Sequence, residues 1–132
     1  MQGSKKRRRN EQNMCYEVID NLTRIDQNVE SLFIKLSGTV IGAIYRPPSG
    51  CVSEFSNFFE NALSFLGSVT KSLIILGDVN IDTISDSSNA NEFRDLIHLY
   101  ACTNVVTVPT RVSTDTEWNA TVCCSTAREA AK

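Results

Sequence analysis

The 132-residue chain has little of what metal sites, disulfide frameworks and membrane spans require. It contains one histidine, His98, and its five cysteines include no C-x-x-C pair. An odd cysteine count favours reduced thiols over disulfides, and a lone histidine does not complete a zinc site. No segment approaches the roughly 18 consecutive apolar residues of a membrane span, and the polar N-terminus carries no secretory signal. We therefore expect a nuclear or cytoplasmic protein that is not secreted and has no membrane partner.

Positive charge is concentrated at one end of the chain, and acidic residues outnumber basic ones in the rest. Five of the 13 basic residues lie in the run Lys5–Arg9, whereas the 15 acidic residues all follow this run. Residues 1–14 show no apolar periodicity, which predicts a disordered basic tail. Such a tail fits a nuclear-localisation signal or a phosphate-contacting patch, and it equally fits a solvated run of charge. The acidic body is unfavourable for broad phosphate binding, which depends on Lys and Arg.

Apolar patterning predicts an alternation of strands and helices, and hence an α/β fold with helices packed on a sheet. Short apolar runs bounded by Gly and Pro are typical of strands, and apolar residues at helical spacing are typical of helices. We expect strands over 30–36, 39–45, 73–76 and 105–108, a helix from Ser53 to Gly67, and a second helix that Asn89 and Glu92 open as a capping box.

Polar side chains follow three of the expected strands at the point where each strand ends. Asp78 and Asn80 are two residues apart, so on an extended segment both point the same way. There the carboxylate accepts a proton from an attacking water while the carboxamide orients that water. Taken alone, the Gly-Asp-Val-Asn sequence is also an ordinary turn, and Tyr45 fits an aromatic at the edge of a core. The three strand ends carry Tyr45 and Arg46, Asp78 and Asn80, and Thr110 and Arg111.

Three segments together resemble one known family. Residues 42–49 (GAIYRPPS), 73–80 (LIILGDVN) and 108–112 (VPTRV) resemble the endonuclease/exonuclease/phosphatase superfamily. More narrowly, they resemble the endonuclease domain of non-LTR (LINE-type) retrotransposons, in which "YRPP", "GDFN" and "PTR" occur in this order. The resemblance implies a partial four-layered α/β sandwich, with two sheets face to face and helices outside. Residues 15–112 would be the central part of this domain, and residues 113–132 a divergent, disordered C-terminal tail.

The resemblance also implies a chemistry. Members of the superfamily are Mg²⁺-dependent phosphodiesterases and phosphatases, and the retrotransposon branch nicks DNA to prime reverse transcription. By this resemblance Asp78 matches the aspartate that activates water, Asn80 the asparagine that positions it, and Tyr45 the tyrosine beside the scissile phosphate. The implied partners are DNA and a reverse transcriptase domain in a parent polyprotein, with no small-molecule cofactor besides Mg²⁺. Thr110 matches a position that supports the active-site or DNA-binding loop. Arg46 and Arg111, which also lie at strand ends, are the other supporting residues.

Several family motifs have no match in this sequence. A complete domain begins with a strand bearing a catalytic Asn and a strand bearing the metal-binding Glu, and neither Glu17 nor Glu30 stands in that context. The family also continues past "PTR" to an Ile-Asp pair and a terminal Ser-Asp-His, whereas no histidine follows Thr110. The sequence therefore identifies no metal ligand, although Mg²⁺ is implied. The change after Glu117 is typical of a frameshifted or degraded copy.

The sequence leaves open whether the chain is an enzyme. The favoured interpretation is a fragment of a retrotransposon endonuclease domain that is inactive as it stands, because catalytic groups of this kind act as a unit. The second is a working nuclease completed by a missing half in trans or in a longer gene product. The third is a non-enzymatic, nucleic-acid-associated fragment that acts through the basic tail.

Overall fold

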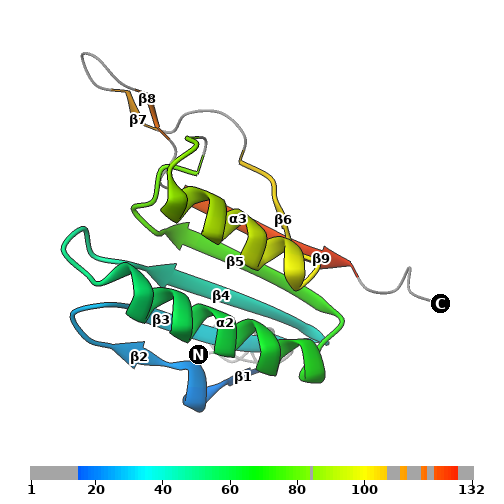
Figure 1. Ribbon diagram of the computed structural model, residues 1–132. Helices are drawn as coiled ribbons and strands as arrows, with labels where there is room; N and C mark the ends of the chain where they lie inside the picture. The colour runs from blue at the N-terminus through cyan, green and yellow to red at the C-terminus, as the bar shows by residue number, and fades with distance from the viewer. Residues whose placement is uncertain (1–14, 84, 107–110, 113–116, 119–120, 128–132) are drawn as a thin grey trace, which may run out of the picture.

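Seven strands form one mixed sheet, and two long helices lie along it (Figure 1). The computed structural model describes residues 15–83, 85–106, 111–112, 117–118 and 121–127. The strand order is β1-β3-β4-β5-β9-β6, and β2 also pairs with β3. The strands of this sheet are β1 (Tyr16–Val18), β2 (Arg24–Ile25), β3 (Glu30–Leu36), β4 (Thr39–Tyr45), β5 (Ser72–Asp78), β6 (Thr103–Asn104) and β9 (Thr121–Ala127). The remaining elements are the short 3₁₀ helix η1 (Asp20–Leu22), the helices α2 (Val52–Val69) and α3 (Ser88–Leu99), and a separate pair of strands, β7 (Arg111–Val112) and β8 (Glu117–Trp118).

The centre of the sheet follows the sequence patterns closely. β3 and β4 form an antiparallel hairpin, and α2 then carries the chain over to β5, which pairs parallel to β4. The hairpin turn consists of Ser37 and Gly38, both at positive φ, as two-residue hairpin loops favour. The predicted strands at 30–36 and 39–45 are confirmed, and the predicted strand at 73–76 extends to Ser72–Asp78.

The two helices have the predicted apolar spacing, but their starts differ from the prediction. α2 begins after Cys51 rather than at Ser53, because the Asn28 Oδ1 atom accepts the Cys51 N–H at 2.9 Å and fixes the entry of the chain. α3 is capped by Ser87, whose hydroxyl accepts the N–H of Ala90 at 3.2 Å, so the predicted cap at Asn89 is wrong. α2 also continues past Gly67 to Val69.

A layer of aromatic side chains joins both helices to the sheet. The rings of Phe55 and Phe59 on α2 stack on each other and on Phe93 of α3, with centroids 5.5–6.4 Å apart. These three rings are almost completely buried, and they share one core with Phe33 and Ile75 of the sheet. Stacked aromatic pairs of this kind add stabilisation beyond the area that they bury.

The structure differs from the sequence prediction in the C-terminal third. Of the predicted strand at 105–108, only Val105 and Val106 are described, and they lie just after β6 (Thr103–Asn104) rather than in a strand; the Asn104 side chain accepts the Val106 N–H there at 3.1 Å. The tail expected over 113–132 also differs, because its residues 121–127 form β9 along the otherwise free edge of β5. The basic tail at 1–14 lies outside the described residues.

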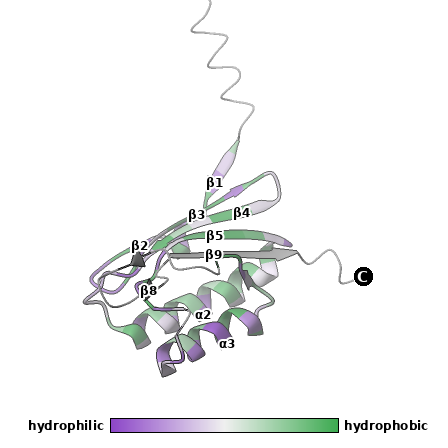
Figure 2. Cartoon of the chain, turned by 90° about the horizontal axis from the view of Figure 1, so that it is seen from above, coloured by the Kyte–Doolittle hydropathy of each residue, from purple (hydrophilic) through white to green (hydrophobic). Residues whose placement is uncertain are grey.

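In the described part of the chain, both long helices lie on one face of the sheet, and the other face carries no helix (Figure 2). Figure 2 shows α2 and α3 on the same side, so the alternating side chains of β3, β4 and β5 are covered on one face only. Leu32 and Leu76 are each 48% exposed on the uncovered side, and Tyr45 is 38% exposed. We call this side the open face. By alternation and strand register its residues are Glu30, Leu32, Ile34, Leu36, Thr39, Ile41, Ala43, Tyr45, Ser72, Ile74, Leu76 and Asp78.

Among the described residues, no helix combines the length and the apolar character that crossing a membrane requires.

Candidate active site at the ends of β4 and β5

The structure brings together the polar residues that end two neighbouring strands. Because β4 and β5 are parallel, their carboxyl ends lie at the same edge of the sheet, where Tyr45 is the register partner of Asp78. The pairing continues one residue beyond the strands, since the Arg46 N–H donates to the Asp78 carbonyl at 3.0 Å. Four residues predicted from the sequence therefore meet here: Tyr45, Arg46, Asp78 and Asn80.

Asp78 and Asn80 are joined by a tight turn rather than by an extended segment. The Asn80 backbone N–H donates to Asp78 Oδ1 at 3.0 Å, and Asn80 has a φ of 52°, a left-handed conformation that Asn tolerates better than most residues. Val79 between them is completely buried in the core. The sequence argument that both side chains share one direction on an extended strand is therefore wrong, although the turn does keep the two half-buried groups together.

The Asn80 carboxamide is also part of the framework of the site. Its Nδ2 atom donates to the Arg46 carbonyl at 2.7 Å, so it ties the end of β5 to the end of β4. The same contact fixes the orientation of the carboxamide plane. A carboxamide held in this way is pre-oriented for any group that it binds.

Arg46 is a buried structural cation. Its side chain is 5% exposed, and its guanidinium donates to the carbonyl oxygens of Val79 at 2.7 Å, Gly50 at 2.6 Å and Asn80 at 2.5 Å. Burial lowers the pKa of Arg46, and the nearby carboxylate of Asp78 partly offsets this shift. Since its donors face backbone carbonyls, Arg46 supports the site by holding two turns together rather than by contacting a substrate.

Tyr45 and Glu30 border a shallow hollow of about 460 Å³ on the open face. The rest of its lining is mainly apolar and includes Leu32, Ala43 and Leu76. Glu30 is the register partner of Tyr45 across the β3–β4 hairpin, so both lie in one row with Asp78. Glu30 matches no family motif in the sequence, yet the two-residue turn at 37–38 alone fixes this pairing.

The described residues do not fit a Mg²⁺ ion. Glu30 and Asp78 are separated by the strand that carries Tyr45, a distance of two strand spacings, or about 10 Å. Mg²⁺ holds its oxygen ligands at about 2.1 Å, so two carboxylates on one ion lie much closer together than this. Among the described residues, no group of three acidic, His or Cys side chains is placed to hold a metal ion.

The remaining candidates lie elsewhere or outside the described residues. Arg111 belongs to β7 in the separate two-stranded sheet, and Thr110 and the run Lys5–Arg9 lie outside the described residues. His98, in the last turn of α3, lines a different hollow, together with Asn104. His98 therefore belongs to a different hollow from the one that Tyr45 and Glu30 border.

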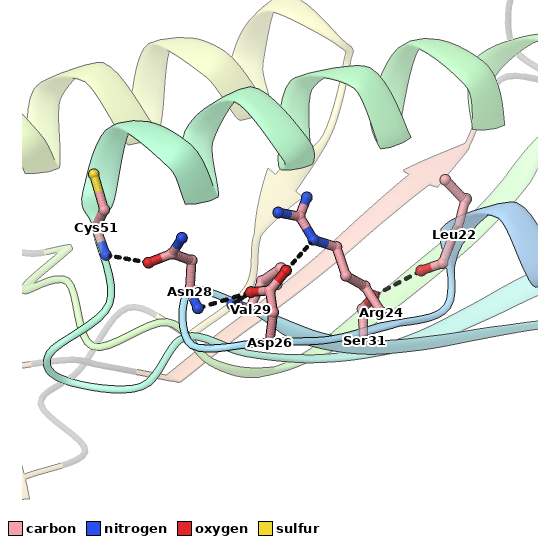
Figure 3. Close-up of polar contacts among 7 residues, drawn as sticks. All are labelled: Leu22, Arg24, Asp26, Asn28, Val29, Ser31 and Cys51. Atoms are coloured by element: carbon pink, nitrogen blue, oxygen red, sulfur yellow. Dashed lines mark hydrogen bonds and ion pairs between the residues drawn. The ribbon is translucent and has the colours of Figure 1, made fainter.

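A second polar cluster has a structural role (Figure 3). Asp26 accepts the N–H groups of Asn28 and Val29 and pairs with Arg24 at 2.5 Å. The hydrogen bond from Arg24, followed by the one from Asn28, lowers the pKa of Asp26. Asn28 in turn accepts the Cys51 N–H, so the loop before β3 is tied to the start of α2. The polar groups of this cluster bond one another, which explains why it orders a loop rather than forms a binding site.

Comparisons with known proteins bear on the fold. No protein-family model matches the sequence, and a search of curated proteins gives no significant match. Among solved structures, the chain is similar to the endonuclease domain of TRAS1, a telomere-specific non-LTR retrotransposon, with a TM-score of 0.61 and 16% identity over 86% of this chain. Lower similarities reach an endonuclease/exonuclease/phosphatase from Bacteroides vulgatus (TM-score 0.42, 14% identity, 84% of this chain and 54% of that one) and a beta toxin from Staphylococcus aureus (TM-score 0.46, 10% identity, 76% and 43%).

The similarity to the TRAS1 domain shows the fold. The mixed sheet with its helices has the α/β fold of this endonuclease domain, which confirms the α/β fold that the sequence implied. The chain spans 56% of the length of that domain.

Proposed function

We propose that this chain is the central part of a retrotransposon-type DNA endonuclease domain, whose complete form hydrolyses a phosphodiester bond and so primes reverse transcription. One observation carries the proposal. Asp78 and Asn80 end β5 directly beside Tyr45 at the end of β4, in a chain with the fold of an endonuclease domain. Carboxylate, carboxamide and phenol are the groups that an attacking water and a phosphate require.

Each of the three groups has a separate role in the proposed hydrolysis. The Asp78 carboxylate accepts the proton of the attacking water, and the bond from the Asn80 N–H holds this carboxylate in place. The Asn80 carboxamide, oriented by the Arg46 carbonyl, positions the water or a phosphate oxygen. The Tyr45 hydroxyl lies at the exposed end of its strand, where it binds an oxygen of the scissile phosphate. Arg46 keeps both strand ends in register.

Mg²⁺ is part of this proposal only for the complete domain. When bound, the ion would stabilise the charge that develops on the phosphate. The described residues hold no ligand set for the ion, so the proposal assigns its ligands to parts of the complete domain outside the described residues. We therefore expect the chain alone to be inactive, because catalytic groups that act as a unit fail together.

A fusion protein tests the proposal. The segments of the TRAS1 domain that this chain does not match, upstream and downstream, are joined to the two ends of the full chain, and nicking of supercoiled plasmid is measured with and without Mg²⁺. We expect nicking by the fusion, none by the chain alone, and a loss of at least about 100-fold in the fusion carrying Asp78→Ala. Asp95→Ala, the same chemical change on the exposed side of α3, is the matched control and should leave the rate unchanged. A folded fusion that does not nick, or one in which Asp78→Ala still nicks, contradicts the proposal.

A further inference from the structure

The peptide group that joins Gly50 to Cys51 is held by hydrogen bonds on both of its sides. Its N–H donates to the Asn28 Oδ1 atom at 2.9 Å (Figure 3), and its carbonyl oxygen accepts a hydrogen bond from the Arg46 guanidinium at 2.6 Å. Because a trans peptide group is planar, its N–H and its carbonyl point in opposite directions. Asn28 and Arg46 therefore fix one rigid unit from opposite sides, and the hydrogen bond to Asn28 also makes the carbonyl a stronger acceptor for Arg46.

The turn that contains Asn28 gives its side chain a fixed starting point. The Asp26 Oδ1 atom accepts the N–H groups of Asn28 at 2.8 Å and Val29 at 3.0 Å, and the Asp26 N–H donates to the Val29 carbonyl at 3.0 Å. Val29 is completely buried, so it anchors this turn in the core. Gly50 lies close against the same turn, because a Cβ at this position would be 3.1 Å from the Asn28 Cα and from the Gln27 carbonyl oxygen. The absence of a side chain at Gly50 therefore lets the two loops approach closely enough for the Asn28 contact.

The Arg46 guanidinium connects this peptide group to the candidate active site. Its other donors reach the carbonyl oxygens of Val79 at 2.7 Å and Asn80 at 2.5 Å, so the position of the guanidinium determines where the turn at 78–80 lies. In that turn the Asn80 N–H donates to Asp78 Oδ1, and the Asn80 carboxamide donates back to the Arg46 carbonyl. A continuous series of hydrogen bonds therefore leads from Asn28 to the side chains of Asp78 and Asn80.

We propose that Asn28 is a positioning residue for Asp78 and Asn80, and that it acts through the Gly50–Cys51 peptide group and Arg46. Within the described residues, the carboxamide oxygen is the one side-chain atom of Asn28 that forms a hydrogen bond, so this oxygen carries the effect. A displacement of about 1 Å in a group that orients the attacking water costs about 100-fold in rate. This catalytic consequence rests on the proposed function, whereas the coupling between Asn28 and the site can be measured in the chain alone.

Nuclear magnetic resonance on the full chain, labelled with ¹⁵N, tests the coupling without any need for activity. Asn28→Ala should shift the Arg46 Nε–H signal and the Asn80 side-chain amide signals. Asn28→Asp keeps the accepting oxygen, so its shifts of these signals should be much smaller.

Ser31→Ala is the matched control for this experiment (Figure 3). It removes a buried hydrogen bond of the same region, from the Ser31 hydroxyl to the Leu22 carbonyl at 2.6 Å, but this bond is not part of the series that leads to Arg46. We expect it to leave the Arg46 and Asn80 signals in place. Gly50→Ala presses the two loops apart and should shift the same signals, which gives a second test that does not depend on whether Asn28→Ala folds. Signals that stay in place in either of these two variants, or that Ser31→Ala or Asn28→Asp shifts as far as Asn28→Ala does, would overturn the proposal.

The fusion protein that tests the proposed function also tests the catalytic consequence. In this fusion Asn28→Ala should lower kcat about 10- to 100-fold with little change in KM, and Asn28→Asp should recover most of the loss. Ser31→Ala should leave kcat unchanged. A fusion that nicks DNA equally well with Asn28→Ala contradicts the present inference alone. A folded fusion that does not nick contradicts the proposed function, and the Arg46 and Asn80 signals then still decide whether Asn28 positions the turn.

Discussion

Replacing Arg46 with alanine is expected to cost much of the stability of this protein. Two of the hydrogen bonds that its guanidinium donates are buried, those to the carbonyls of Val79 and Gly50. Each hydrogen bond to a charged group contributes about 1.5–3 kcal/mol, and a buried carbonyl left without a partner loses a similar amount. Returning the guanidinium to water offsets part of this, so we expect a loss of about 3–5 kcal/mol. For a chain of 132 residues this is at least a fifth of a total of about 5–15 kcal/mol.

Urea unfolding, followed by circular dichroism at one fixed protein concentration, gives this loss directly. Arg46→Lys keeps the charge, but a single ammonium cannot reach the carbonyls of both turns, so it should recover only part of the loss. Arg94→Ala is the control, because Arg94 is half-buried on α3 and bonds Thr83 and Asn91 near the surface. We expect it to cost about 1 kcal/mol. An Arg46→Ala protein no less stable than the Arg94→Ala protein would refute the view that Arg46 holds the two strand ends together.

Two further predictions concern stability. Gly77→Ala should cost at least about 3 kcal/mol in urea unfolding or prevent folding, because its Cβ would lie 1.8 Å from the Ile44 carbonyl oxygen and force β4 and β5 apart. Gly38→Ala meets no atom within 4 Å and should cost only the strain of its positive φ, about 1–2 kcal/mol; equal losses would contradict the steric argument. The lowered pKa of Asp26 means that its carboxylate stabilises the fold above the unfolded pKa near 3.8, and that this contribution is lost as the pH falls through the folded pKa. The melting temperatures of the wild type and of Asp26→Ala should therefore converge below pH 4, and a difference that stays constant with pH would contradict this linkage.

The central strands and the position of the site could be predicted because they depend on local patterns. The strands at 30–36 and 39–45 are apolar runs bounded by turn residues, and the strands in the structure begin and end at these same residues. The meeting of Tyr45 with Asp78 follows once both strands are placed parallel in one sheet. A strand-helix-strand alternation is the usual signal for this parallel pairing.

The role of Arg46 could not be predicted, because it depends on contacts between distant segments. An arginine between a strand and two prolines fits an exposed phosphate-binding position as well as a buried one. Its burial follows from three carbonyl oxygens that come from two different turns, 47–50 and 79–80. The starts of the helices were missed for the same reason, since the start of α2 is fixed by Asn28, 23 residues upstream of Cys51.

The pairing of β5 with β9 has a consequence for the order in which the chain folds. β3, β4, α2 and β5 are contiguous in the sequence and connect through a tight hairpin and one crossover, so they can assemble early. β9 joins only after a further 42 residues, because Asp78 pairs with Thr121. Until then β5 is an edge strand with unpaired backbone groups, and the apolar side chains of its open face remain exposed as well. A ribosome-bound chain that has just completed β5 therefore exposes both an unpaired strand edge and an apolar sheet face. At this stage of synthesis we expect the chain to be most prone to aggregation and to binding by chaperones.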